Sequence, residues 1–115
     1  MKISFDLDDT LLKYPNELLS FGLFMQKMGH QVGLLSGKAV WDIEQNIIPA
    51  LQRVGFIPNF YIGADNEGID PGPEVTQEEK DRDWKPKKII EHNIDIHFDN
   101  CADLMKGNFK AIKII

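Results

Sequence analysis

The sequence predicts an α/β protein in which helices cover both faces of a parallel sheet. Short apolar segments typical of strands alternate with longer segments whose apolar side chains recur every three or four positions. Such alternation is typical of parallel strands joined by crossover helices. The length of 115 residues suits one domain, residues 1–115, and an apolar content of 43% is ordinary for a globular chain.

The first half of the chain is expected to supply two strands and two helices. Residues 3–7 form an alternating apolar run, which predicts the first strand. A proline and a glycine bound the next apolar stripe, so a helix is expected at 15–29. Residues 31–35 read as the second strand and 39–54 as the second helix. Pro49 should kink or divide that helix because it lacks a backbone N–H.

Three further strands are expected in the second half, at 60–62, 94–98 and 110–115. A short helix at 86–92 begins with proline, which is acceptable at a first helical position. These elements complete a five-stranded sheet between two helical layers, and we expect a Rossmann-like fold with strand order 5-4-1-2-3.

An acidic segment at about 64–84 separates the third strand from the last helix. It holds eight carboxylates against one lysine and one arginine, together with two glycines and two prolines. This composition predicts a solvated loop, with at most one helical turn near 76–80.

Two carboxylates follow the first expected strand. Residues i and i+2 of an extended segment project to the same side, so Asp6 and Asp8 converge where the strand ends. Two carboxylates held together repel each other unless a cation or a shared proton relieves them. This pair therefore indicates a functional site.

Polar side chains also follow the other expected strands. Ser36 and Gly37 end the second strand, Asp99 ends the fourth, and Asp103 lies four residues further on. Lys85 precedes the helix that leads to the fourth strand. In open parallel sheets, ligands bind beyond the carboxyl ends of the strands. Hard oxygen ligands suit Mg²⁺, and a cation, a lysine and a hydroxyl are what a phosphoryl group requires.

These residues resemble the four motifs of haloacid dehalogenase superfamily phosphohydrolases, in order and over nearly the whole chain. Lys85 is the expected third-motif lysine, with Lys87 and Lys88 as alternatives. The motifs appear as Ile-Ser-Phe-Asp-Leu-Asp-Asp-Thr at 3–10, Val-Gly-Leu-Leu-Ser at 32–36, Lys85, and Asp-Asn-Cys-Ala-Asp at 99–103.

The resemblance implies a Mg²⁺-dependent phosphatase that hydrolyses a phosphomonoester. Asp6 would attack phosphorus to form an aspartyl phosphate, and Asp8 would act as general acid and base. The resemblance assigns Mg²⁺ to Asp6, the carbonyl of Asp8 and Asp99, with Asp103 or Asn100 assisting, and the substrate phosphate to Ser36, Gly37 and Lys85.

No cap domain is expected. Only 27 residues separate Asp8 from Ser36, and 22 separate Ile62 from Lys85. The acidic segment 64–84 would stand in place of a cap and leave the site open. An open site can reach a phosphorylated small molecule or a phosphoprotein, and a second copy of the chain could cover it.

Two other functions stay open. A receiver-like signalling module is also doubly wound and carries a phosphorylatable aspartate, but it needs that aspartate at the end of the third strand, which here reads Ile-Gly-Ala-Asp at 62–65. A non-catalytic binding domain of the same superfamily is the other alternative, although the chain retains every motif acid.

Charge and cysteine content bear on partners and location. The net charge of −5 disfavours nucleic acid and anionic membranes as partners. The single cysteine, Cys101, cannot form an internal disulfide, which favours a reducing cytoplasm. No apolar run approaches the roughly 18 residues of a membrane span, and early aspartates argue against a signal peptide.

Overall fold

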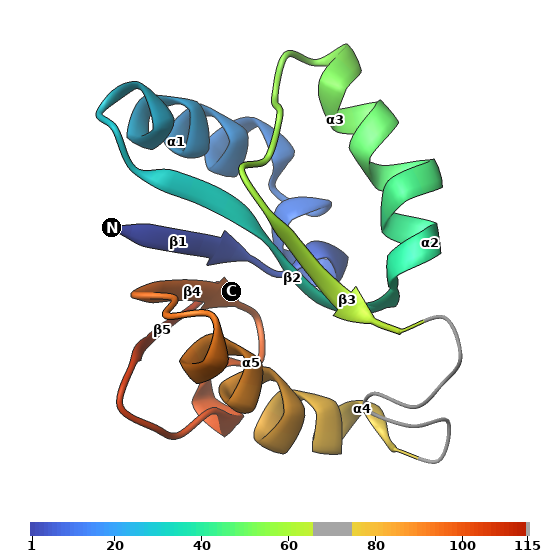
Figure 1. Ribbon diagram of the computed structural model, residues 1–115, viewed down its shortest axis with the longest axis vertical. Coiled ribbons are helices and arrows are strands. Elements are labelled where there is room, and N and C mark those ends of the chain that lie inside the picture. The colour runs from blue at the N-terminus through green and yellow to red at the C-terminus, as the bar shows by residue number, and fades with distance from the viewer. Residues whose placement is uncertain (66–74, 115) are drawn as a thin grey trace.

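Five parallel strands form one sheet in the order β3-β2-β1-β4-β5, which is the expected order read from the other edge (Figure 1). The parallel sheet and the helices between its strands confirm the predicted α/β class. The computed structural model describes residues 1–65 and 75–114. In chain order the elements are β1 (Lys2–Phe5), η1 (Leu7–Leu11), α1 (Pro15–Lys27), β2 (Gln31–Ala39), α2 (Val40–Asp42), η2 (Ile43–Ile47), α3 (Ile48–Arg53), β3 (Tyr61–Ala64), α4 (Gln77–Glu79), η3 (Lys80–Trp84), α5 (Lys85–Glu91), β4 (Ile96–Asp99), η4 (Ala102–Leu104) and β5 (Lys110–Lys113).

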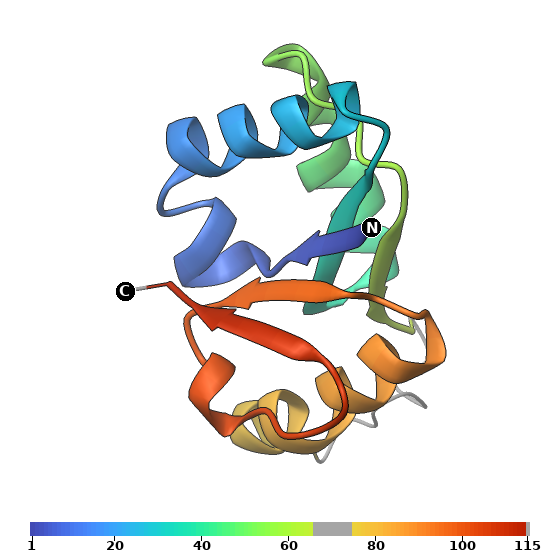
Figure 2. The same cartoon turned by 90° about the vertical axis from the view of Figure 1, so that its left-hand side faces the viewer.

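Helices lie on both faces of the sheet and make three layers (Figures 1 and 2). One face packs against α1 and the α2–α3 region, in a core that contains Phe5 and Phe56. The other face packs against α5, in a core that contains Leu35, Trp84 and Ile89. Burial of these side chains is the main stabilising contribution, at about 1.5–3 kcal/mol for each large apolar side chain.

Strand β2 is longer than the sequence predicted. It continues past Leu35 to Ala39, so Ser36 and Gly37 lie inside the strand rather than after it. Its pairing with β3 skips from Leu35 to Ala39, where Ala39 meets Ala64. Such an irregularity bends a strand and frees the skipped residues from the ladder. The end of β2 is therefore available to line a site.

The helical region 40–53 is continuous, so Pro49 does not divide it. The π-helical segment η2 joins α2 to α3, and Pro49 is the second residue of α3. The irregularity lies in the turn before the proline, where a π-helical turn accommodates a residue that has no backbone N–H.

The helical turn expected near 76–80 is confirmed by α4, but the loop predicted for 81–84 is wrong, because η3 continues the helix there. Elements α4, η3 and α5 follow one another without a break from Gln77 to Glu91. The hydroxyl of Thr76 accepts a hydrogen bond from the Glu79 N–H at 3.1 Å, and the Glu79 carboxylate reaches back to the Thr76 N–H. This capping box is the start signal of the helix. The remainder of the predicted loop, 66–74, lies outside the described residues.

Replacing Thr76 by alanine is expected to lower the free energy of unfolding by about 1 kcal/mol, because the first turn of α4 loses its cap. Urea unfolding followed by circular dichroism measures this loss. Thr76→Ser keeps the hydroxyl and should retain most of the stability. Equal losses in the two variants would show that the hydroxyl does not cap the helix.

The strand order reverses beside β1. The chain passes from β1 through β2 to β3 at one edge and then returns to β4 on the other side of β1. Ligand sites of open parallel sheets lie at this reversal, beyond the carboxyl ends of the strands. In residues 1–65 and 75–114 no cap domain interrupts the fold, and no helix there is long and apolar enough to span a membrane.

Candidate functional site

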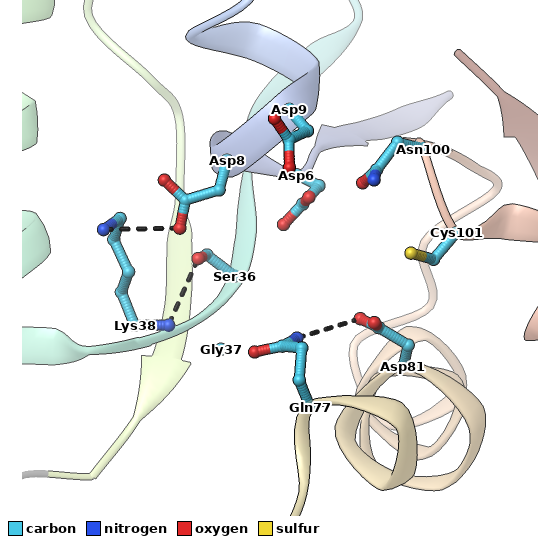
Figure 3. Close-up of a pocket in the computed structure, with 10 residues that line it drawn as sticks. All are labelled: Asp6, Asp8, Asp9, Ser36, Gly37, Lys38, Gln77, Asp81, Asn100 and Cys101. Carbon is cyan, nitrogen blue, oxygen red and sulfur yellow. Dashed lines mark hydrogen bonds and ion pairs between the residues drawn. The ribbon is translucent and has the colours of Figure 1, made fainter. Parts of the chain in front are cut away.

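A pocket of about 340 Å³ opens at the strand-order reversal (Figure 3). Its walls come from the loop after β1, the end of β2, the first turns of the α4–η3 segment and the loop after β4. Nearly every side chain in it is polar. The lining residues are Asp6, Asp8, Asp9, Ser36, Gly37, Lys38, Gln77, Asp81, Asn100 and Cys101.

The loop after β1 places three aspartates at the pocket. The N–H of Asp6 donates to the carbonyl of Phe98 at 2.9 Å, which ties this residue to β4. Asp6 is buried, whereas the side chain of Asp8 is 64% exposed. Asp9 has a φ of 59°, a left-handed conformation that aspartate tolerates better than most residues. The loop thus holds Asp6 at the floor of the pocket and Asp8 at its rim.

Lys85 is buried beneath the floor and contacts three carboxylates. Its Nζ lies 3.0 Å from Asp6 Oδ1, 3.0 Å from Asp81 Oδ1 and 2.8 Å from Asp99 Oδ2. An ammonium has three N–H donors, and three acceptors occupy them. Lys85 therefore neutralises and positions these carboxylates. Lys85 does not line the pocket, so in this structure it is not placed for the direct contact with substrate phosphate that the resemblance implies.

The other lysines considered for the third motif lie away from the pocket. Lys87 is exposed and pairs with Glu91 at 3.9 Å. Lys88 pairs with the same carboxylate group at 3.4 Å and lies over the ring of Trp84. Of the three candidates, Lys85 is the one that reaches the motif aspartates.

The Asp99 carboxylate is enclosed by protein donors. Its Oδ2 accepts from Lys85 and from His97 Nε2, the latter at 2.9 Å, and its Oδ1 accepts from the Cys101 N–H at 2.9 Å. Asp99 has no exposed surface and does not line the pocket. The next residue, Asn100, does line it, and its N–H donates to the buried hydroxyl of Thr10 at 3.0 Å.

The environment separates the pKa values of the two buried motif aspartates. Burial, opposed by the charge of Lys85, raises the pKa of Asp6 to about 6. Burial also opposes ionisation of Asp99, but the hydrogen bond from His97 and the charge of Lys85 outweigh it and lower its pKa to about 2. For Lys85 the charges of Asp6 and Asp99 outweigh burial, so its pKa lies above the usual value.

Cys101 is not a nucleophile in this setting. Burial and the negative charges of Asp81 and Asp99 raise the pKa of its thiol to about 11. The thiol stays protonated at neutral pH, and the thiolate is the reactive form.

The buried part of the site carries an excess of negative charge. Asp6, Asp81 and Asp99 share the single ammonium of Lys85, which leaves two negative charges when all are ionised. A buried charge without a partner is costly, and a hard cation or a proton relieves it. Oxygen donors at the pocket suit Mg²⁺. The described residues nevertheless contain no group of three His, Cys, Asp or Glu side chains arranged to hold a metal ion.

Asp103 lies outside the pocket, although the fourth motif assigned it to the metal. It sits in the short turn η4, and its exposed carboxylate pairs with Lys113 at 3.3 Å. Of the residues that the resemblance assigns to the metal, Asp6, Asp8 and Asn100 line the pocket, whereas Asp99 and Asp103 do not.

The opposite wall carries the residues expected to bind phosphate. Ser36 and Gly37 line the pocket, and the Ser36 hydroxyl accepts from the Lys38 N–H at 3.2 Å. The Lys38 ammonium lies 3.4 Å from Asp8 Oδ2 (Figure 3). The Lys80 ammonium donates to the Gly37 carbonyl at 3.3 Å, which joins β2 to η3.

Asp81 and Gln77 are pocket residues that the sequence analysis assigned to the acidic loop. Gln77 Nε2 donates to Asp81 Oδ1 at 3.2 Å, the same oxygen that contacts Lys85. Asp81 precedes Lys85 by four positions, the helical spacing that brings two side chains together. This spacing is visible in the sequence, but it brings two side chains together only within a helix. The acidic composition instead predicts a loop at 81–84.

Comparisons of this chain with protein-family models, with curated proteins and with solved structures found no match.

Proposed function

We propose that this protein is a Mg²⁺-dependent phosphatase of the haloacid dehalogenase type that uses Asp6 as its nucleophile. One observation carries the proposal. Asp6 faces an open polar pocket at the strand-order reversal, while Lys85, buried behind it, holds its other carboxylate oxygen at 3.0 Å. A nucleophile requires this combination of fixed geometry and access to substrate.

The proposed reaction has two steps, transfer of the phosphoryl group to Asp6 and hydrolysis of the aspartyl phosphate. An Asp6 oxygen forms a bond to phosphorus while the bond from phosphorus to the ester oxygen breaks, and Asp8 gives a proton to the departing oxygen. Water then attacks the aspartyl phosphate, Asp8 accepts the proton, and inorganic phosphate leaves with Asp6 restored. The position of Asp8 at the rim, 64% exposed, allows it to serve both steps.

In this proposal the Asp6 carboxylate, the Asp8 carbonyl and the Asn100 amide oxygen would hold Mg²⁺, since these three residues line the pocket. A bound Mg²⁺ supplies positive charge that offsets the repulsion between an anionic nucleophile and an anionic substrate. Two local features support its binding: the donors are all oxygens, and the buried carboxylates exceed the ammonium that neutralises them. Ser36 and Gly37, at the opposite wall, are positioned to hold phosphate oxygens.

Hydrolysis of a generic aryl phosphate tests this function. We expect turnover with Mg²⁺ and its loss when EDTA removes the metal, with recovery when Mg²⁺ is added back in excess. Ca²⁺ is the matched control ion, because its longer bonds and larger ligand number suit this small oxygen site less well. Turnover that persists undiminished in EDTA would contradict the proposal.

A receiver-like module is disfavoured by topology. In receiver-type sheets the strand order is 2-1-3-4-5, with the third strand inside the sheet. Here β3 is an edge strand, and Asp65 beyond it does not line the pocket. The same assay separates the two functions, because a receiver retains its acyl phosphate, whereas a phosphatase turns over. A non-catalytic binding domain would show neither behaviour.

The pocket is open, which bears on substrates and partners. We propose a phosphorylated small molecule or a phosphoprotein as substrate, and a second copy of the chain as a cover for the pocket. The acidic surroundings of Asp8, Asp9 and Asp81 disfavour nucleic acid. The single cysteine is consistent with a reducing cytoplasmic setting.

A further inference from the structure

One face of two neighbouring strands is polar and buried. Ser4 belongs to β1 and Asp6 follows this strand directly, whereas His97 and Asp99 belong to β4. Ser4 and His97 are register partners. Ser4, His97 and Asp99 have no exposed surface, and Asp6 is 5% exposed. Apolar side chains ordinarily occupy such positions in a sheet covered on both faces. Four buried polar groups at the centre of this sheet therefore require an explanation beyond packing.

Both ring nitrogens of His97 are engaged. Nδ1 lies 2.7 Å from the Ser4 hydroxyl, and Nε2 lies 2.9 Å from Asp99 Oδ2. An ionised carboxylate accepts only, so Nε2 carries the proton and Nδ1 accepts from the Ser4 O–H.

We propose that His97 is a positioning residue for the nucleophile, acting through Asp99 and Lys85; the inference rests on the proposed phosphatase function. His97 holds Asp99 Oδ2, which receives Lys85 at 2.8 Å, and Lys85 in turn holds Asp6 Oδ1 at 3.0 Å. Hydrogen bonds thus connect Ser4, in the interior of the sheet, to the attacking group.

The direction of Asp99 depends on two donors from its own strand and loop. The Cys101 N–H fixes Oδ1, and His97 fixes Oδ2. Without His97, Asp99 Oδ2 loses one of its two donors, and the carboxylate is free to rotate about its Cβ–Cγ bond. Lys85 would then shift away from Asp99 toward Asp81, and Asp6 would lose its fixed orientation. A small displacement of a nucleophile lowers the rate of the chemical step far more than it lowers the affinity for substrate.

Two variants of similar size separate positioning from packing. The amide nitrogen of His97→Gln can occupy the place of Nε2 and donate to Asp99. The shorter His97→Asn can reach Ser4 but not Asp99. We expect His97→Asn to lower kcat by roughly 10–100-fold with KM within about threefold. His97→Gln should recover most of that kcat.

Nitrogen NMR of the wild-type protein supplies a measurement that needs no variant to fold. We expect Nε2 of the His97 ring to carry a proton. An unprotonated Nε2, equal kcat in the two variants and the wild type, equal losses in the two variants, or a change confined to KM would each overturn the inference while the phosphatase stands. A wild type that fails to hydrolyse phosphate esters would instead remove the proposed function, and the positioning role with it.

Discussion

Replacing Asp6 by asparagine is expected to abolish turnover and to stabilise the metal-free protein at the same time. The amide cannot attack phosphorus, so kcat should fall on the order of 10⁴-fold or more, as in other enzymes that lose a nucleophile. Its oxygen still accepts a hydrogen bond from Lys85, so the site keeps its geometry. A residual rate within tenfold of wild type would contradict the role of Asp6.

The stability change depends on pH in a stated direction. The pKa of Asp6 is about 6 in the folded protein against an ordinary value of 3.8, so the folded state binds this proton more tightly than the unfolded state. Stability of the wild type therefore falls as pH rises from about 4 to about 6 and stays lowered above that range. Asp6→Asn lacks this loss. We expect a gain of roughly 1–3 kcal/mol above pH 6 that vanishes below pH 4.

Urea unfolding in EDTA at several pH values measures this gain. Asp103→Asn is the matched control, because it makes the same chemical change at an exposed surface pair. It should change stability by less than about 0.5 kcal/mol at any of these pH values and should retain turnover. A pH-independent difference between Asp6→Asn and wild type would show that the Asp6 charge does not strain the fold.

Replacing Lys85 by methionine is expected to have the largest effect on stability of any single change at the site. Methionine has a similar length but no charge, so it leaves Asp6, Asp81 and Asp99 buried without their common partner. Removing one member of a buried ion pair costs about 3–5 kcal/mol. We expect a loss of that size at pH 7.5 and little or no turnover.

The loss should shrink as pH falls. Without the ammonium, the folded variant takes up protons on these carboxylates more readily than the unfolded chain does, so its stability rises toward pH 4. The wild type draws stability from the low pKa of Asp99, which is lost only as pH approaches about 2. The gap between the two proteins is therefore widest near neutral pH.

Lys87→Met supplies the matched control for this prediction. Lys87 is exposed, and its pair with Glu91 at 3.9 Å is a surface contact worth at most about 0.5 kcal/mol. If Lys85→Met does not fold at pH 7.5, circular dichroism at pH 4.5 should show recovered structure. Equal stability of the two lysine variants at pH 7.5 would refute the account of the buried cluster.

Local patterns predicted the five strands and the first helix. The irregular turn before Pro49 followed from the missing N–H of proline, and the end of α1 followed from a glycine that adopts a φ of 91°. The prediction failed beyond Lys80. The acidic composition of the segment predicted a loop up to residue 84, whereas the helix that begins at the Thr76 capping box continues into α5.

The sequence by itself determined the parallel α/β fold and the edge of the sheet near which Asp6, Ser36 and Asp99 lie, although Ser36 falls inside β2 and not at its end. Periodicity and chain order are enough for that, because side-chain direction in a strand follows from position alone. Only the tertiary structure decided which charges meet. Lys85 lies beneath the pocket rather than in it, Asp81 belongs to the buried cluster, and Asp103 pairs with Lys113. These contacts depend on how α5 packs on the sheet and on the cost of burying unpaired charge, and no local sequence pattern reports either of them.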